Sequence, residues 1–250
     1  LLTGADPDQT LVQFVFFSTI CSYSFHYYFT THSVIPSPRI KWQAKNRNLL
    51  LFFFIAGLAG SVILFFRLSA YWSWLLPAIV ATFLYSAPKL PHPIFHRLRK
   101  VAIGKTIFLA FVWMYVTTVL PVIVSVQPWN ITFTLYAASR YFFIYCICIL
   151  FDFRDRADDK AEGVKSLITY LSEKNITLLY YFSLLVYIIC TVWMAGFGFS
   201  ILQIILLLLP GVILAFIHNY ARRNFSDLLY FVVLDGLMAL SAFLMLVAGI

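Results

Sequence analysis

Long apolar runs separated by short polar segments dominate the pattern of hydrophobic and polar positions in this chain. Eight runs are long enough to cross a bilayer core of ~30 Å, which takes about 20 helical residues. They have the approximate ranges 10–31, 48–66, 70–87, 103–126, 130–151, 175–197, 200–218 and 228–249. The apolar-polar alternation of a membrane β-barrel is missing, and a helix satisfies its own backbone hydrogen bonds in lipid. The pattern predicts one all-α, polytopic transmembrane domain over residues 1–250.

Basic residues are concentrated in every second connection between these runs. Of the 18 lysines and arginines, 16 lie in or beside the connections at about 32–47, 88–102, 152–174 and 219–227. Because short basic loops stay in the cytoplasm, these four connections are predicted to be cytoplasmic and both chain ends to lie on the other side. Prolines in the first two predict extended or turned loops, whereas 152–174 holds better helix formers with a break at Gly163.

Composition agrees with a membrane-embedded chain. Hydrophobic residues make up 62% of the sequence and charged residues 11%, which a soluble globular domain does not show. The net charge of +8 follows from the basic loops, so it does not indicate a nucleic-acid partner. The four cysteines all lie inside apolar runs and are interpreted as small hydrophobic residues. The predicted location is an integral membrane protein, with the bacterial inner membrane as the working expectation and membrane lipid as its surroundings.

Acidic residues gather in a single segment. Five of the ten lie within 152–162, and none lies between Asp8 and Asp152. On a helix, Asp152, Asp155 and Asp159 fall within an arc of about 60°, where like charges repel one another. A positive charge is therefore needed to hold them, and hard oxygen ligands are those that Mg²⁺ prefers.

Two sources of this positive charge remain open. One is a bound divalent cation, and the other is an ionic network formed by the interleaved Arg154, Arg156 and Lys160. Carboxylates, a metal ion and the cations of neighbouring loops would together suit a diphosphate, whose lipid tail would enter the apolar bundle. The candidate diphosphate contacts are Lys89, Arg97, Arg99 and Lys105. The alternative is that these cations only set the orientation of the chain in the membrane.

Two charged residues fall inside predicted spans, where charge is costly and usually functional or paired. Arg140 lies in the fifth span and Asp235 in the last. One hypothesis is that the two form an ion pair across the bundle. The alternative is that each side chain reaches into a central cavity separately.

The acidic segment resembles a motif of a known family. The sequence Asp152-x-x-Asp155-x-x-x-Asp159-x-x-x-Gly163-x-x-Ser166-Leu167 is similar to the second aspartate-rich motif of the UbiA superfamily of intramembrane prenyltransferases. The stretch 84–89 resembles the end of that family's fourth helix, and Gly104-Lys105 with Trp113 and Pro121 resembles its fifth. The resemblance implies nine helices, of which the first is missing here. It also implies magnesium, an isoprenoid diphosphate and a lipophilic acceptor.

One part of the family pattern is missing from this chain. Active members carry a first motif, N-D-x-x-D-x-x-x-D, which should fall at 22–32, and these residues include no carboxylate. His26 and His32 are possible substitute ligands, although such histidines more often have interfacial roles. The sequence therefore leaves two functions open. One is a magnesium-dependent prenyltransferase that uses an aromatic or other lipophilic acceptor. The other is a catalytically degenerate subunit, or a lipid- or pigment-binding scaffold, within a larger membrane complex.

Overall fold

The computed structural model describes residues 8–29, 38–86, 104–161, 163–164 and 166–249. Every regular element within these ranges is helical, which confirms the all-α prediction. The helices in chain order are α1 (Gln9–Phe29), α2 (Pro38–Lys45), α3 (Arg47–Arg67), η1 (Ser69–Tyr71), α4 (Trp72–Ser86), α6 (Lys105–Met114), η4 (Tyr115–Val119), α7 (Leu120–Val124), α8 (Ile131–Ala161), α9 (Leu167–Tyr170), α10 (Glu173–Trp193), η5 (Met194–Phe197), α11 (Ile201–Ala221), η6 (Leu229–Leu234) and α12 (Asp235–Val247).

Each of the eight predicted spans corresponds to a helix or to a continuous run of helical segments. Within the described ranges, six of these are long and apolar enough to cross a membrane: α3, α6 through α7, α8, α10 with η5, α11, and η6 with α12. Helix α1 has 21 residues, but hydroxyl-bearing and other polar side chains lower its hydropathy. Helix α4 has 15 described residues and so falls short of the usual spanning length.

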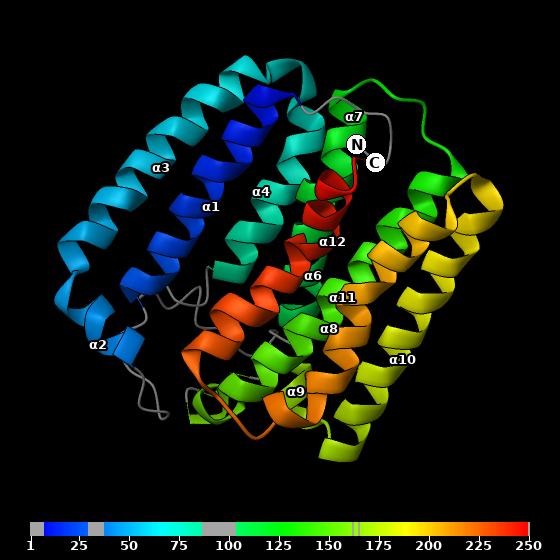
Figure 1. Ribbon diagram of the computed structural model, residues 1–250. Helices are drawn as coiled ribbons and strands as arrows, with labels where there is room; N and C mark the ends of the chain where they lie inside the picture. Colours follow the sequence, from blue (N-terminus) through cyan, green and yellow to red (C-terminus); the bar gives the residue numbers. More distant parts are fainter. Residues whose placement is uncertain (1–7, 30–37, 87–103, 162, 165, 250) are drawn as a thin grey trace.

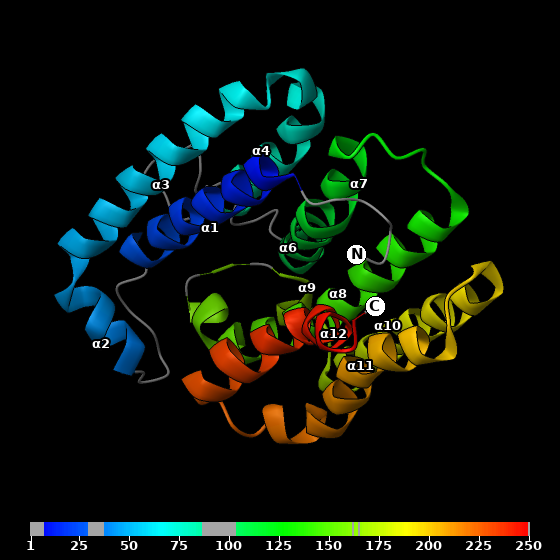
Figure 2. The same cartoon turned by 45° about the horizontal axis from the view of Figure 1, so that its top comes forward.

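The bundle consists of two groups of helices joined by α6 and α7 (Figures 1 and 2). One group contains α1, α3 and α4, and the other contains α8, α10, α11 and α12. Each group is held together by an apolar cluster of its own. The first includes Leu64 and Leu75, and the second, larger cluster surrounds the buried face of α8 and includes Phe143 and Tyr180. Helix α6 packs against both α4 and α8, so it brings its own residues to the junction of the groups.

Helices α1 and α3 approach each other closely because Gly57 presents no side chain at their contact. A Cβ atom at Gly57 would lie 2.7 Å from the backbone nitrogen of Cys21 and 2.9 Å from the carbonyl oxygen of Phe17. A hydrogen bond of 3.2 Å also joins the hydroxyl groups of Ser18 and Ser61 across this interface. Small residues and hydroxyl contacts of this kind are typical of helices that pack within lipid.

Helix α8 extends well past the predicted span. Its 31 residues reach about 46 Å, whereas the apolar core of a bilayer is ~30 Å thick. The acidic segment therefore lies on the last turns of one continuous helix. The helix ends at Ala161, shortly before Gly163 adopts a left-handed backbone with φ of 70°, as the sequence predicts.

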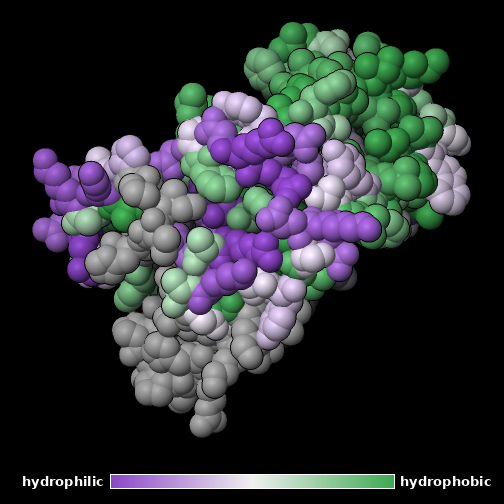
Figure 3. All heavy atoms as spheres, turned by 90° about the horizontal axis from the view of Figure 1, so that it is seen from below, coloured by the Kyte–Doolittle hydropathy of each residue, from purple (hydrophilic) through white to green (hydrophobic). Residues whose placement is uncertain are grey.

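The first basic connection contains a helix that the sequence analysis did not predict. Helix α2 begins at Pro38, because proline lacks a backbone N–H that the first turn would leave unpaired in any case and its fixed φ suits a helix start. Together with α9 and the end of α8, it lies at the lower end of the bundle in Figure 1, opposite the end where α1 begins and α12 ends. Hydrophilic residues gather over the middle and left of this lower face, and a large apolar region lies at its upper right (Figure 3). The separation agrees with the alternating charge of the connections.

Candidate functional site

Lys105 links two of the three aspartates on α8. Its Nζ atom lies 3.2 Å from both carboxylate oxygens of Asp159 and 3.5 Å from Oδ1 of Asp152. The two carboxylates are seven residues apart, so they lie on the same side of α8 and flank the ammonium group. All three side chains are largely buried, with exposed fractions of 20% for Lys105, 6% for Asp152 and 11% for Asp159. Lys105 is thus the main counter-charge of this cluster.

The next residue of α6 completes the cluster. Thr106 is buried, and its hydroxyl group donates a hydrogen bond to Oδ2 of Asp152. The beginning of α6 therefore supplies both a cation and a hydrogen-bond donor to the end of α8. Neither buried carboxylate of what we call the α8 cluster, namely Lys105, Thr106, Asp152 and Asp159, lacks a partner.

The third aspartate has a different partner. Nε of Arg154 lies 2.8 Å from Oδ1 of Asp155, whose side chain is 36% exposed. Arg156 instead donates to the backbone carbonyl of Leu171 at 2.8 Å. Among the ion pairs of the described residues, the predicted network within the acidic run is therefore represented by Arg154 with Asp155. On the buried face of α8, the carboxylates are instead compensated by Lys105 of α6. The sequence had suggested this lysine as a contact for a diphosphate.

A magnesium ion needs several oxygen ligands gathered around one point. Within the part of the chain that the structure describes, no three side chains of histidine, cysteine, aspartate or glutamate are gathered closely enough to hold a metal. The Lys105 ammonium lies between Asp152 and Asp159, where a bridging cation would have to lie. The described residues do not fit a three-carboxylate metal site. Three further predicted cations, Lys89, Arg97 and Arg99, lie outside the described residues.

Aromatic side chains occupy the position of the missing first motif at the end of α1. The His26 ring stacks on Tyr85 of α4 with ring centroids 5.8 Å apart, and Tyr23 lies 6.4 Å from Trp113 of α6. These contacts explain His26 as a packing residue that joins α1 to α4, while His32 lies outside the described residues.

Arg140 and Asp235 do not form the ion pair that the sequence analysis considered. Arg140 donates instead to the backbone carbonyl of Met238 at 2.6 Å and to the Ser241 hydroxyl at 3.4 Å, and its guanidinium lies over the Phe143 ring. Asp235 lies about one turn before Met238 on the same helix, and the contacts of Arg140 fall on the following turns. Arg140 therefore fastens α8 to α12 through uncharged groups.

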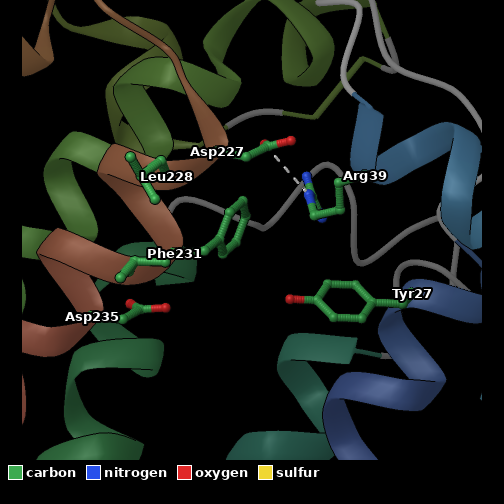
Figure 4. Close-up of a pocket in the computed structure, with 7 residues that line it drawn as sticks. Tyr27, Arg39, Asp227, Leu228, Phe231 and Asp235 are labelled. Atoms are coloured by element: carbon green, nitrogen blue, oxygen red, sulfur yellow. Dashed lines mark ion pairs between the residues drawn. The ribbon is translucent and has the colours of Figure 1, made fainter.

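A pocket of about 490 Å³ lies between α1, α2 and the η6–α12 helix (Figure 4). The Tyr27 hydroxyl and the Asp235 carboxylate point into it from opposite sides. At its rim Arg39 pairs with Asp227, with 3.6 Å between Nε and Oδ1. No signal in the sequence marks Tyr27, Arg39 or Asp227 as residues of a site. Only the intramembrane carboxylate of Asp235 gave a signal, because such a charge is rarely placed in lipid without a function.

Comparisons with known proteins identify the family but no individual relative. A family model described as the UbiA prenyltransferase family matches residues 29–246, which is most of the chain. Searches of curated proteins and of solved structures found no match. The matched range includes the α8 cluster, η6 and Asp235.

Proposed function

The chain belongs to the UbiA prenyltransferase family, and we propose that it transfers an isoprenoid chain from its diphosphate to a lipophilic acceptor in the membrane. The observation that carries this proposal is the α8 cluster. It lies at the polar end of a long membrane helix, on the segment that resembles the family's second aspartate-rich motif. The apolar interior of the bundle is suited to an isoprenoid tail, and the polar end is suited to its head group.

The described residues would assist the proposed reaction mainly through their charge. In the proposed reaction the bond between the first carbon of the isoprenoid and the diphosphate oxygen breaks, and the diphosphate leaves with the electron pair. A new bond forms to the acceptor, which loses a proton. Stabilising the negative charge on the leaving group is usually the largest contribution to catalysis of this kind. Lys105 is the described cation best placed to provide it, since its ammonium group is already held at the end of α8.

Magnesium binding is a separate proposal. Asp152, Asp155 and Asp159 carry the oxygen ligands that magnesium takes, and a bound ion would add further charge stabilisation for a diphosphate. The described arrangement instead compensates these carboxylates with Lys105 and Arg154. We therefore derive no chemical step through a metal ion, and we treat magnesium dependence as a quantity to be measured.

A specific observation favours the second candidate function, a degenerate subunit or a lipid- or pigment-binding scaffold. The end of α1 carries no carboxylate, and its side chains are engaged in aromatic packing with α4 and α6. This chain has one acidic motif, and Lys105 and Arg154 already compensate its charge. Such a chain has less capacity to ionise an allylic diphosphate. Under this alternative the protein would bind an isoprenoid lipid without transferring it, with partner subunits supplying the activity.

The test is equilibrium binding of geranylgeranyl diphosphate to the purified protein in nanodiscs, with and without magnesium. The double variant Asp155→Asn/Asp159→Asn removes two carboxylates of the motif. Glu173→Gln is the matched control, because it removes a carboxylate that is 66% exposed and pairs with Arg222 outside the cluster. We expect binding that is retained in the control and lost in the double variant, because Asp159 holds the Lys105 ammonium in place. The two magnesium conditions measure whether the ion is needed.

Two outcomes would decide against parts of this proposal. Binding that is absent, or that is indifferent to the double variant, would overturn the transferase reading for this donor. Binding that occurs equally in a chelator would overturn the magnesium dependence alone. Binding without turnover, when candidate acceptors are added, would favour the degenerate subunit over the enzyme.

A further inference from the structure

We propose that the exposed face of α2, formed by Lys41, Trp42 and Lys45, binds the head group of an anionic phospholipid. We call these three residues the α2 face. It is separate from the α8 cluster and from the proposed transfer reaction. Helix α2 lies at the edge of the bundle, next to α3 and at the same end as α9 (Figure 1). The lipid would belong to the membrane leaflet on the side of the basic connections.

The opposite side of α2 is fixed to the protein. Arg39 and Gln43 are one turn apart, so they lie on the same side of the helix. Gln43 is buried, and Arg39 pairs with Asp227 at 3.6 Å between Nε and Oδ1. The Arg39 guanidinium also lies 4.3 Å from the centroid of the Phe231 ring. These contacts hold the orientation of α2, so its other face is turned away from the bundle.

The α2 face carries positive charge that the described residues do not compensate. Lys41, Trp42 and Lys45 are all exposed, and at about 100° per residue they fall within an arc of roughly 100°. The chain has no acidic residue between Asp8 and Asp152, and neither lysine takes part in an ion pair among the described residues. Two ammonium groups one turn apart repel each other, and an anion between them relieves the repulsion.

Helix α2 lies at the depth where phospholipid head groups are found. Helix α3, which is long and apolar enough to cross a membrane, begins at Arg47, only two residues after Lys45. Its first two turns expose Leu49 and Phe52, so the apolar surface begins about one turn beyond α2. The Trp42 side chain is 50% exposed beside the two lysines. Tryptophan is enriched at this boundary, where its ring meets both the head groups and the hydrocarbon.

An anionic phospholipid fits both parts of this surface. Its phosphate group suits the two ammonium groups, and its acyl chains suit the exposed apolar side chains at the beginning of α3. A zwitterionic phospholipid carries a cation of its own, which the lysines would repel. A soluble acidic protein would match the charge of the α2 face but would not cover the apolar surface of a membrane-spanning helix.

The experiment measures which lipid touches Trp42. The full chain is reconstituted in vesicles of equal parts phosphatidylglycerol and phosphatidylcholine, and one of the two lipids carries brominated acyl chains, which quench tryptophan fluorescence on contact. The signal of Trp42 is the difference between the protein and its Trp42→Phe variant. We expect phosphatidylglycerol to associate about fivefold more strongly at this position, which is the gain that one basic residue near a membrane surface provides.

Three pairs of substitutions locate the source of this preference, each measured against Trp42→Phe in the same background. Lys41→Gln/Lys45→Gln should abolish the preference, whereas Lys41→Arg/Lys45→Arg keeps the charge and should keep it. The matched control is Lys174→Gln/Arg223→Gln, which removes the same charge from two exposed residues at the same end of the bundle. This control should leave the preference at Trp42 unchanged.

Three outcomes would overturn the inference. A native protein without preference for phosphatidylglycerol would leave an acidic protein as the remaining occupant of the α2 face. A preference that persists in Lys41→Gln/Lys45→Gln would show that these lysines do not bind the head group. An equal loss in the control would show that the preference comes from the overall charge of the polar end. Unchanged elution and thermal unfolding show that each variant is folded.

Discussion

The α8 cluster and the Asp235 pocket treat their carboxylates in opposite ways. In the cluster, Asp152 and Asp159 share the Lys105 ammonium, and Thr106 donates to the first of them. In the pocket, Asp235 has no ion-pair partner among the described residues and faces an open volume. In the cluster the carboxylates connect α6 to α8, whereas the half-buried Asp235 carboxylate forms no ion pair that would connect two helices. The comparison predicts that the same kind of mutation has unequal effects in the two regions.

Removal of the Lys105 charge should have the largest effect. Lys105→Met keeps much of the side-chain volume but leaves Asp152 and Asp159 buried without their counter-charge. Breaking a buried ion pair from one side typically costs about 3–5 kcal/mol of unfolding free energy. Unfolding of the protein in detergent by heat or denaturant measures this loss. Lys105→Arg is the control that keeps the charge, and a Lys105→Met protein as stable as the native one would contradict the role of the cluster.

Removal of the Thr106 hydroxyl should have the next largest effect. Thr106→Val is nearly isosteric and leaves Asp152 with one donor fewer at a buried position. Hydrogen bonds to charged groups contribute about 1.5–3 kcal/mol, so we expect a loss in that range. The same unfolding measurement applies, with Thr106→Ser as the variant that restores the donor. Equal stability of the valine and serine variants would show that the hydroxyl group is dispensable.

Neutralisation of Asp235 should change stability far less than either mutation in the cluster. Asp235→Asn breaks no ion pair among the described residues and neutralises a half-buried carboxylate, so the unfolding free energy should change by less than about 1 kcal/mol. A large loss of stability on this mutation would indicate that the carboxylate has a structural partner and would remove the contrast between the two regions.

The smallest effect is expected at an exposed ion pair of the polar end. Nη2 of Arg222 lies 2.7 Å from Oε2 of Glu173, whose side chain is 66% exposed. Because solvent screens such a pair, Glu173→Gln should lower the unfolding free energy by no more than about 1 kcal/mol. Thermal unfolding at low and high salt measures it, and the small difference should vanish at high salt. A loss of unfolding free energy as large as that caused by Lys105→Met would show that burial does not explain the difference between the α8 cluster and this exposed pair.

Much of the architecture could be predicted from the sequence, because it depends on periodicity and length. The eight apolar runs became helices, the acidic run fell on a helical face, and Gly163 followed the end of α8. The positions of helices in a chain follow from local composition, and lipid leaves few alternatives to a helix. The family also followed from local spacing, since the aspartates and Gly163 lie on one continuous segment.

The pairing of charges was predicted less well. The ionic network was one of two alternatives for the acidic run. Arg154 does pair with Asp155, but Arg156 donates to the Leu171 carbonyl instead. Arg140 was considered as a partner for Asp235, and it bonds to Met238 and Ser241. Such choices depend on how neighbouring helices are rotated and shifted against each other, which the pattern along one helix does not specify.

The sequence by itself determined that this chain is a helical membrane protein with its carboxylates at the end of one span and a single acid in the last. Only the tertiary structure decided which cation meets which carboxylate. Lys105 and Asp159 are 54 residues apart and meet because α6 packs against α8. Tyr27 and Asp235 come from opposite ends of the chain and face one pocket. Helical periodicity places residues on a face of their own helix, whereas contacts between helices depend on how whole surfaces pack.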